Sequence, residues 1–202
     1  MSTTRPAPTR EDRRTALVLA AYRQIAARGF EGLRTREVAA EVGVNIATLH
    51  YYFPTKEKLI EGVVEHAMQR FRSTLEPHGS PADQLRAYLR AVRRLLQAEP
   101  ELGAVMGELA LRSSRDPALS QVMAGMYELW HVTVRGLLKR AAKEGALRRE
   151  YDSDEVAAII VSTLTAMSLP AVSGGRRGDQ ALRQLERWLG IAGRTPNHTS
   201  SN

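Results

Sequence analysis

The amino-acid sequence predicts an all-α protein, with a small N-terminal three-helix bundle that contains a helix-turn-helix and a larger C-terminal helical domain. A chain of 202 residues is long enough for one small unit and one larger helical core. Hydrophobic residues make up 43% of the chain but aromatic residues only 5%, so the core must be built mainly from Leu, Ala and Val. That composition suits helices better than sheets.

The first predicted helix runs from Glu11 to Arg28, and Gly29 stands where a helix commonly stops. Apolar residues recur along it at helical spacing, which predicts one buried face. They are Ala16, Leu17, Ala20, Ala21, Ile25 and Ala26.

The segment from Thr35 to Phe53 predicts two short helices around a tight turn at Gly43. The Thr35 hydroxyl can cap the first of these helices, and Asn45 is a good cap for the second. Gly43 stands where a left-handed residue is needed to leave a helix. Pro54 ends the second helix.

The second of these helices has distinct inner and outer faces. Leu49 and Phe53 lie one turn apart and are expected to face the core. On a period of 3.6 residues, Ala47, Thr48 and Tyr51 then point away from the core. An outward face this small and polar can enter the major groove of DNA, so the pair of helices is interpreted as a DNA-reading helix-turn-helix.

Four features in this region occur in a fixed order. They are Thr35, Val42-Gly43-Val44, the run from Ala47 to Phe53, and Lys56-Glu57-Lys58-Leu59. Together they make the segment resemble the TetR family of transcriptional regulators, whose N-terminal signature has a capped helix, a Gly-Val turn, a Thr-Leu-Tyr-Tyr-Tyr-Phe-like run and a Lys-Glu-x-Leu helix start. The resemblance covers Arg10 to about Leu59, and the remainder matches in its all-helical pattern and length. His50 departs from the commoner Tyr.

Candidate contacts to double-stranded DNA follow from the residue types and from the resemblance together. They are Thr35, Arg36, Asn45, Ile46, Ala47, Thr48, His50, Tyr51 and Lys56. The resemblance places Arg36 over a base edge, where a guanidinium can bind guanine, and a solvated surface arginine is the alternative. It also implies phosphate contacts for Thr35 and Lys56. Asn45, Thr48 and Tyr51 are expected to contact phosphate because helix starts and hydroxyls suit phosphate oxygens.

Three of these assignments leave a second role open. Ile46 either lies at the core edge or reads a base, as the resemblance implies. Ala47 either meets a thymine methyl group or is only small enough to allow close approach. His50 flanks the core on the helical wheel, so a packing role competes with a DNA contact.

Charge and residue usage limit the class of protein. The net charge of +7 and the pI near 10.1 fit attraction to phosphate, although charge alone is weak evidence. The absence of cysteine excludes disulfides and thiol catalysis and suits a reducing cytoplasm. The histidines are scattered and no catalytic constellation is visible, so we expect no metal, no cofactor and no enzymatic activity.

Polar residues and Pro170 interrupt the apolar run from Val156 to Val172, which predicts a buried helix in place of a membrane span.

We expect a DNA-binding domain at residues 10–55, an effector-binding and dimerisation domain at 56–192, and disordered tails at 1–9 and 193–202. Glycine and proline divide the larger domain into helices. They are predicted at Lys56 to about Leu75, Asp83 to Ala98, Glu101 to Ser113, Pro117 to Glu144, Ser153 to Ser168 and Asp179 to Leu189.

These helices carry more apolar surface than one face requires. Methionines adapt to irregular shapes, so a ligand pocket is predicted among them, although a packed core explains the same residues at least as well. The candidate ligand-binding residues are Met106, Met123, Met126, Tyr127, Trp130 and Met167. The polar groups expected to orient a ligand are Tyr127, His131, Glu108 and Thr163.

The last two predicted helices are candidates for a dimer interface. Small side chains permit close helix approach and large ones supply apolar contact, while burial inside one protomer is the alternative. The candidates are Ile159, Ser162, Ala166, Leu182, Leu185 and Trp188. The resemblance also implies a four-helix dimer interface made by these helices.

The sequence and the resemblance together predict a homodimeric, ligand-responsive repressor of the cytoplasm. It would leave a palindromic operator when an apolar or amphipathic small molecule binds. Two alternatives belong to other classes. A general or architectural DNA-binding protein would show low sequence specificity, and a small helical enzyme or carrier would bind a metabolite but no DNA.

Overall fold

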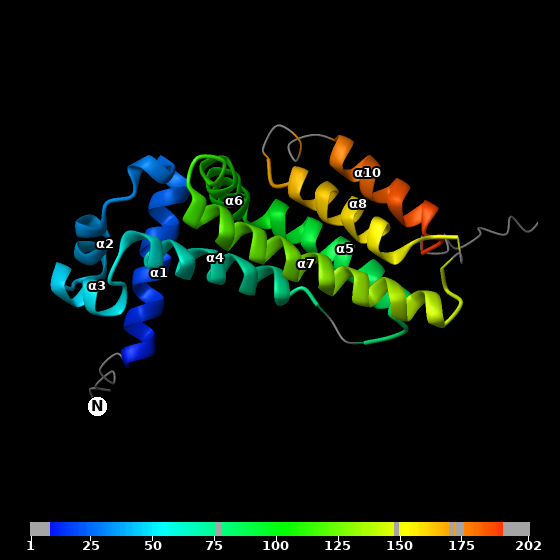
Figure 1. The fold of residues 1–202 in the computed structure, drawn as a ribbon, viewed down its shortest axis with the longest axis horizontal. Helices are drawn as coiled ribbons and strands as arrows, with labels where there is room; N and C mark the ends of the chain where they lie inside the picture. The colour runs from blue at the N-terminus through cyan, green and yellow to red at the C-terminus, as the bar shows by residue number, and fades with distance from the viewer. Residues whose placement is uncertain (1–8, 76–77, 148–149, 170–171, 173–175, 192–202) are drawn as a thin grey trace, which may run out of the picture.

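The computed structural model describes residues 9–75, 78–147, 150–169, 172 and 176–191. Over these residues the chain forms α-helices and one short 3₁₀ helix without any strand, which confirms the all-α prediction (Figure 1). The elements are α1 (Arg10–Arg28), η1 (Phe30–Gly32), α2 (Thr35–Val42), α3 (Ile46–Tyr52), α4 (Lys56–Arg72), α5 (Pro81–Ala98), α6 (Pro100–Ser113), α7 (Pro117–Lys143), α8 (Ser153–Ala166) and α10 (Arg176–Trp188). The predicted tails at 1–9 and 193–202 lie outside the described residues, apart from Thr9.

Helix α1 organises the N-terminal unit by packing against η1, α2, α4 and α6. It begins at a capping box, in which the Thr9 hydroxyl accepts from the Asp12 backbone N–H at 3.1 Å and the Asp12 carboxylate accepts from the Thr9 N–H at 2.8 Å. These bonds hold the pKa of Asp12 below its usual value. The helix ends at Gly29, whose φ of 70° favours glycine. The longest helix of the N-terminal unit therefore has a defined start and a defined end.

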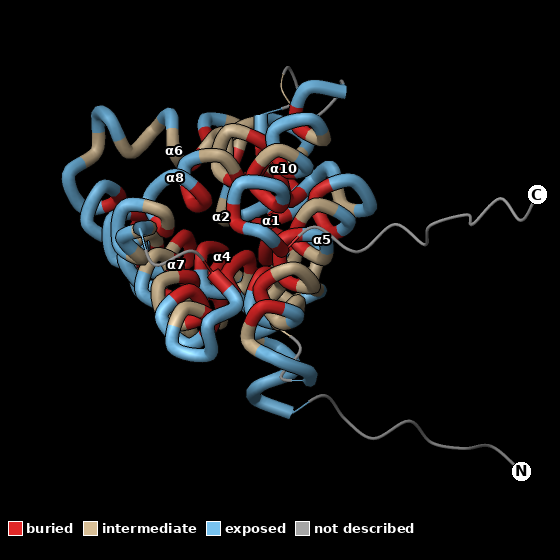
Figure 2. The backbone as a smooth tube through the Cα atoms, turned by 90° about the vertical axis from the view of Figure 1, so that its right-hand side faces the viewer, coloured by how far each residue is buried: buried red, intermediate tan, exposed pale blue. Residues whose placement is uncertain are grey.

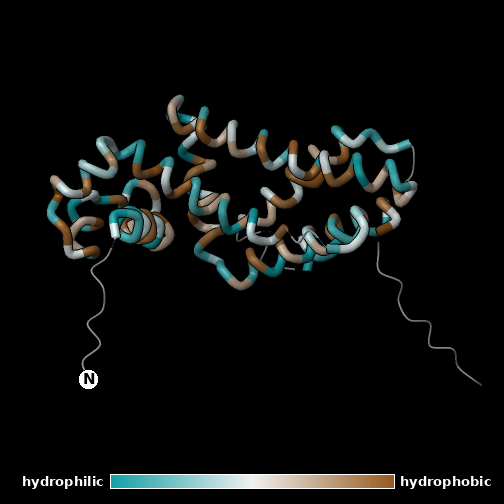
Figure 3. The backbone as a smooth tube through the Cα atoms, turned by 90° about the horizontal axis from the view of Figure 1, so that it is seen from below, coloured by the Kyte–Doolittle hydropathy of each residue, from teal (hydrophilic) through white to brown (hydrophobic). Residues whose placement is uncertain are grey.

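Helix α7 is the central helix of the larger domain and packs against α4, α5, α6 and α8. Buried residues gather on the inward faces of these helices, and hydrophilic and hydrophobic residues alternate along each helix (Figures 2 and 3). Among the residues with assigned positions, no helix has both the length and the apolar character that crossing a bilayer requires. Helix α4 belongs to both parts of the molecule, because it starts beside α3 and runs into this core.

Helix α10 is fastened to α5 by arginines that are spaced along α5. Arg90 binds Glu186 through two hydrogen bonds of 2.8 and 3.0 Å. Arg93 makes a bidentate pair with Asp179, and Arg86 donates to the backbone oxygen of Ile191. Leucines of both helices, among them Leu89 and Leu185, are buried in the core. The last helix is thus held by both charge pairing and apolar packing.

Several helix boundaries differ from those predicted. Helices α5 and α6 begin at Pro81 and Pro100, earlier than expected, because proline fits the first position of a helix, where no N–H is needed. Helix α4 ends at Arg72 and not near Leu75. The hydroxyls of Ser73 and Thr74 there bond back to backbone oxygens of the last turn. Helix α10 begins at Arg176, ahead of the predicted Asp179.

Candidate functional site

The turn between α2 and α3 has the geometry that the sequence predicts. Gly43 is left-handed, with φ 73° and ψ 30°, and its N–H bonds to the end of α2. The N–H of Val44 reaches back to the Ala39 oxygen at 2.9 Å. Asn45 then caps α3, because its Oδ1 accepts from the Thr48 backbone N–H at 2.7 Å and from the Thr48 hydroxyl at 3.0 Å. The turn therefore fixes the orientation of α3 against α2.

The predicted cap of α2 is wrong. Thr35 is the first helical residue, and Arg34 is the N-cap, without any side-chain cap bond. The reason is the short η1 helix, which the sequence analysis missed. Arg34 leaves it in an extended conformation, its N–H bonds to Gln24 Oε1 at 3.2 Å, and its guanidinium bonds to backbone oxygens of Glu31 and Leu33. Half-buried Thr35 still lies at the N-terminus of α2.

Helix α3 turns its polar residues outward as expected. Leu49 and Phe53 are buried beneath it, whereas Ala47 and His50 are exposed and Tyr51 is 66% exposed. The exposure of His50 removes the packing role that the sequence left open. Helix α3, with this outward ridge of Ala47, His50 and Tyr51, lies at the end of the molecule that is farthest from α10 (Figure 1).

An arginine from α1 joins this ridge. The Arg10 guanidinium lies 5.2 Å from the centre of the Tyr51 ring, and the Tyr52 ring meets that of Tyr51 edge-on at 5.3 Å. Arg10 lies one residue before the predicted start of this helix at Glu11, and the structure places it inside the helix. The capping box at Thr9 and Asp12 was the signal that could have placed Arg10 in the first turn of a helix.

Ion pairs on α2 leave Arg36 available. Glu37 pairs with Arg28 at 2.7 Å, and Glu41 pairs with Arg23 at 2.7 Å, so both carboxylates of α2 are neutralised from α1. The Arg36 side chain is exposed and makes no ion pair with any residue whose position is described. Helix α2 therefore presents one uncommitted cation beside α3.

The remaining two predicted contacts lie at the margin of this surface. Ile46 is half-buried and packs against the core, so its side chain is shared between the core edge and the surface. Lys56 starts α4, and its Nζ lies 4.7 Å from the centre of the Phe30 ring. The structure thus brings all nine predicted DNA contacts onto α2, α3 and their flanking residues at one end of the molecule.

Phe30 links this unit to the larger domain. Its backbone N–H donates to the Glu108 carboxylate of α6 at 3.0 Å. Arg112, one turn further along α6, lies 5.0 Å from the centre of the Phe30 ring and pairs with Glu31 at 3.0 Å. Glu108, one of the polar groups expected to orient a ligand, here holds the turn between α1 and α2.

The predicted ligand-binding methionines are packed in the core. Met106, Met123, Met126 and Met167 are buried, as is Trp130. The Trp130 ring stacks on Phe71 with centres 4.9 Å apart, and its N–H donates to the Tyr88 hydroxyl. These side chains fill the space between the helices, and none of them lines the open groove beside α7. Packing, the alternative explanation, therefore accounts for all five.

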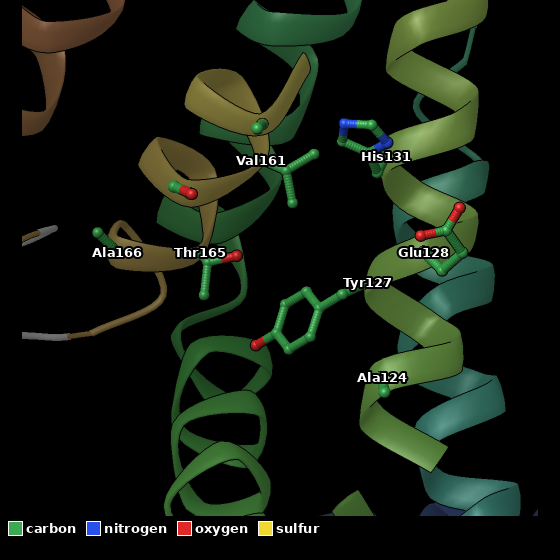
Figure 4. A pocket seen from close by; sticks show the side chains of 9 residues that line it. Ala124, Tyr127, Glu128, His131, Val161, Thr165 and Ala166 are labelled. Atoms are coloured by element: carbon green, nitrogen blue, oxygen red, sulfur yellow. The ribbon is translucent and has the colours of Figure 1, made fainter. Parts of the chain in front are cut away.

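Tyr127 alone of the predicted ligand-binding residues lines that groove, which has a volume of about 670 Å³ and lies between α7 and α8 (Figure 4). Its lining residues are Ala124, Tyr127, Glu128, His131, Ala158, Val161, Ser162, Thr165 and Ala166. Burial raises the pKa of Tyr127, and the neighbouring Thr165 hydroxyl partly offsets the rise. His131, also predicted to orient a ligand, lies here, whereas Thr163 bonds to the Ile159 oxygen of its own helix at 2.8 Å.

The predicted dimer residues separate into two groups. Leu182 and Leu185 are only 4% and 5% exposed, so most of their surface packs inside the protomer, as the alternative expects. Ile159 is 51% exposed and Trp188 is 57% exposed, and both line a hollow of about 380 Å³ between α8 and α10. Ser162 and Ala166 also reach the surface of α8, where they border the groove toward α7.

Family models match both parts of the chain. A model described as bacterial regulatory proteins of the tetR family matches residues 17–63. A second, described as the C-terminal domain of tetracyclin-repressor-like proteins, matches residues 75–184. The two matches together cover the helix-turn-helix and most of the larger domain.

The sequence identity between this chain and its individual relatives is low. EthR, an HTH-type transcriptional regulator of Mycolicibacterium smegmatis, is 26% identical over 145 residues, which are 69% of this chain and 65% of that protein, or slightly less than two thirds of its length. The nucleoid occlusion factor SlmA of Haemophilus influenzae is 26% identical over 162 residues, covering 78% of this chain and 72% of that protein.

Solved structures share the fold. A TetR transcription regulator from Haloarcula marismortui has a TM-score of 0.78 and 19% identity, over 89% of this chain and 97% of that one. AibR, solved with isovaleryl coenzyme A and operator DNA, has a TM-score of 0.65 and 20% identity, over 88% of this chain and 98% of that one.

Proposed function

This chain belongs to the TetR family of bacterial regulatory proteins, and we propose that it is a transcriptional repressor that binds a palindromic operator as a homodimer. Two copies would place their α3 helices in major grooves about one turn of DNA apart. A small molecule bound to the larger domain would release the operator. The protein would act in the cytoplasm and without catalysis.

The observation that carries this proposal is the outward face of α3. Leu49 and Phe53 anchor the helix in the core, and the Gly43 turn sets its angle to α2. The ridge of Ala47, His50 and Tyr51 can then enter a groove without disturbing the fold.

The polar contacts divide into reading and positioning roles. Arg36 is free to read a guanine edge, since the carboxylates on its helix are already paired. Asn45 uses its oxygen to cap α3, which leaves its amide N–H groups to donate to a phosphate. The DNA backbone on the two sides of α3 would be contacted by Thr35, Thr48, Tyr51 and Lys56. Arg10, stacked on Tyr51, adds a cation to the same phosphate path.

The exposed faces of α8 and α10 support dimerisation. Ile159 and Trp188 are large apolar side chains that lie in the open beside one hollow. Ala158 and Ser162 are small and exposed on α8, so a partner helix could approach closely. A second copy that covers this face would bury all four side chains.

The connection between the two parts of the molecule supports control by a ligand. Helix α4 begins at Lys56, beside the DNA-reading helix, and continues into the larger core. Glu108 and Arg112 of α6 hold the turn at Phe30 and Glu31. A shift of the larger domain would therefore move the reading unit at two points.

Selection of DNA from a random pool by the purified protein tests the proposal. A repressor of this kind enriches a palindrome, and footprinting shows protection of both half-sites. Tyr51→Ala should weaken binding to the selected site, whereas Leu111→Ala, which changes an exposed apolar residue of α6, should not. Binding without enrichment of any sequence would favour a general DNA-binding protein, and no binding would favour a helical carrier or enzyme.

A further inference from the structure

The groove between α7 and α8 has several short side chains in its lining. Ala124 on α7 and Ala158 and Ala166 on α8 have short side chains, which leave the space beside Val161 unfilled. The volume of about 670 Å³ lies within the roughly 300 to 1,000 Å³ of small-molecule sites. Most of its lining is apolar, so the groove can receive the hydrocarbon part of a ligand.

The polar groups of the groove are the carboxylate of Glu128, the imidazole of His131 and the hydroxyls of Tyr127, Ser162 and Thr165. His131 Nε2 lies 3.1 Å from the backbone oxygen of Asp154, and a carbonyl can only accept, so this nitrogen carries the proton. In the tautomer with its proton on Nε2, Nδ1 can accept a hydrogen bond. Thr165 Oγ1 is buried and has no hydrogen-bond partner of acceptable geometry in the described part of the chain, although the Tyr127 hydroxyl lies beside it (Figure 4).

The formal charge of the lining is negative. Glu128 contributes a carboxylate that is exposed at the mouth, and no described residue forms an ion pair with it. Among the residues whose positions are described, neither lysine nor arginine lines the groove. The nearest basic residue further along α7 is Arg135, which is occupied by Asp154 at 2.8 Å. Glu128 would therefore repel an anionic ligand, whereas a cationic donor would meet the Glu128 carboxylate and hydroxyl oxygens that can accept.

We propose that this groove binds an amphipathic organic amine, with its ammonium group at Glu128 and its hydrocarbon part along Val161 and the small residues of α8. This inference rests on the proposed function, because it identifies the chemical class of the effector. The ammonium N–H groups would donate to Glu128 and to the acceptors nearby. Hydroxyl groups of the ligand, where present, would bond to Tyr127 and Thr165.

The position of the groove would allow a bound amine to affect the contact between two protomers and, through it, operator binding. Ser162 and Ala166 border the groove and also belong to the surface of α8 on which the partner would pack. An occupant that pushes on these residues changes how two protomers meet. The spacing of the two α3 helices would change with it, and the amine and the operator would bind antagonistically.

Calorimetric titration of the full chain without DNA tests the ligand class. The probes are decylamine, decanol and decanoate, which share a chain length and differ in charge, each used below its micelle concentration. Wild-type protein should bind decylamine about tenfold more tightly than decanol, as expected for one charge-assisted hydrogen bond, and decanoate more weakly than both. Equal binding of the amine and decanol would overturn the proposal.

Two variants locate the site. Glu128→Gln should remove the roughly tenfold preference for the amine and leave decanol binding unchanged. Glu144→Gln, which removes the same charge from the exposed end of α7, should have no effect. Ala124→Phe should fill the groove and weaken all three probes. If Glu128→Gln and Glu144→Gln behave alike, the amine binds elsewhere and the assignment fails.

Separate measurements distinguish this inference from the proposed function. Enrichment of a palindrome by the protein, together with no preference for the amine, would refute the groove assignment alone. Amine binding that depends on Glu128 in a protein that enriches no DNA sequence would refute the repressor proposal and leave the site standing. Release of the selected DNA by decylamine in wild-type protein, but not in Glu128→Gln, is the expected joint result.

Discussion

Glu108 accepts a hydrogen bond from the backbone N–H of Phe30 at 3.0 Å, across the boundary between the DNA-reading unit and the larger domain. The two residues lie 78 positions apart in the chain. The preceding residue is Gly29, where a Cβ atom would stand 2.9 Å from the Glu108 carboxylate. A Cβ atom would crowd the end of the Glu108 side chain, and the φ of 70° itself favours glycine at this position, while the carboxylate ties the turn to α6.

Glu108→Ala should destabilise the protein by about 1 to 3 kcal/mol, because the half-buried N–H of Phe30 loses its acceptor. Glu108→Gln retains an acceptor oxygen of the same reach and should cost clearly less. Urea unfolding of both variants measures the difference. Equal losses would show that the charge, and not the hydrogen bond to Phe30, is what matters.

Arg36→Ala should remove discrimination between the selected operator and scrambled DNA. A bidentate arginine contributes roughly 1 to 3 kcal/mol against a wrong base. Affinities for both DNA molecules, measured in the same salt, give the result. If both weaken by the same factor, Arg36 contacts phosphate and reads no base.

Lys56→Ala should weaken binding to all DNA sequences by similar factors and reduce the slope of log affinity against log salt by about one unit. Lys58→Ala is the matched control. Lys58 is two residues away and already pairs with Glu61 at 2.8 Å, so its loss should leave the slope nearly unchanged. A full slope in Lys56→Ala would mean that this lysine stays over the Phe30 ring and neutralises no phosphate.

Ile159→Asp combined with Trp188→Asp should separate the protomers and abolish operator binding, because both exposed side chains would place charge in the proposed interface. Sedimentation and circular dichroism report mass and helix content. Leu111→Asp is the control, since this residue is 72% exposed on α6. Leu185→Asp is unsuitable because it would bury a charge inside the protomer. A double variant that remains dimeric would move the interface to another face.

Glu99 should make the free energy of unfolding depend on pH under acidic conditions. The hydrogen bond from Arg70 holds the pKa of Glu99 below its ordinary value. Because the folded pKa is depressed, the contribution of this pair is present above the unfolded pKa of about 4.3 and is lost as pH falls through the folded value. Between about pH 6 and about pH 3, wild-type protein should therefore lose more unfolding free energy than Glu99→Gln. Parallel losses in urea titrations would contradict this.

Local sequence determined the helix-turn-helix. Gly43 is left-handed and Asn45 caps α3 because turn and cap preferences act over three or four residues and need no distant partner. Helical spacing likewise predicted that Leu49 and Phe53 face inward and that Tyr51 faces outward. These features could be read directly from the order of residues.

Tertiary packing decided what the apolar residues do. Sequence spacing identifies an apolar side chain but does not say whether it meets its own core, a ligand or a second copy. Met126 and Leu185 proved to be core residues, while Ile159 and Trp188 were left on the surface. Their sequence contexts are alike, and only the packing of neighbouring helices separates them.

Tertiary structure also decided the contacts between distant segments. Arg34 replaced Thr35 as the cap of α2 because η1 and Gln24 direct the chain there. Glu108 meets Phe30 only because segments far apart in the chain lie side by side, and the groove opens where α7 and α8 pack against each other. The sequence therefore determined the structures formed within a few residues, whereas burial and long-range hydrogen bonding, which depend on the whole fold, decided the rest.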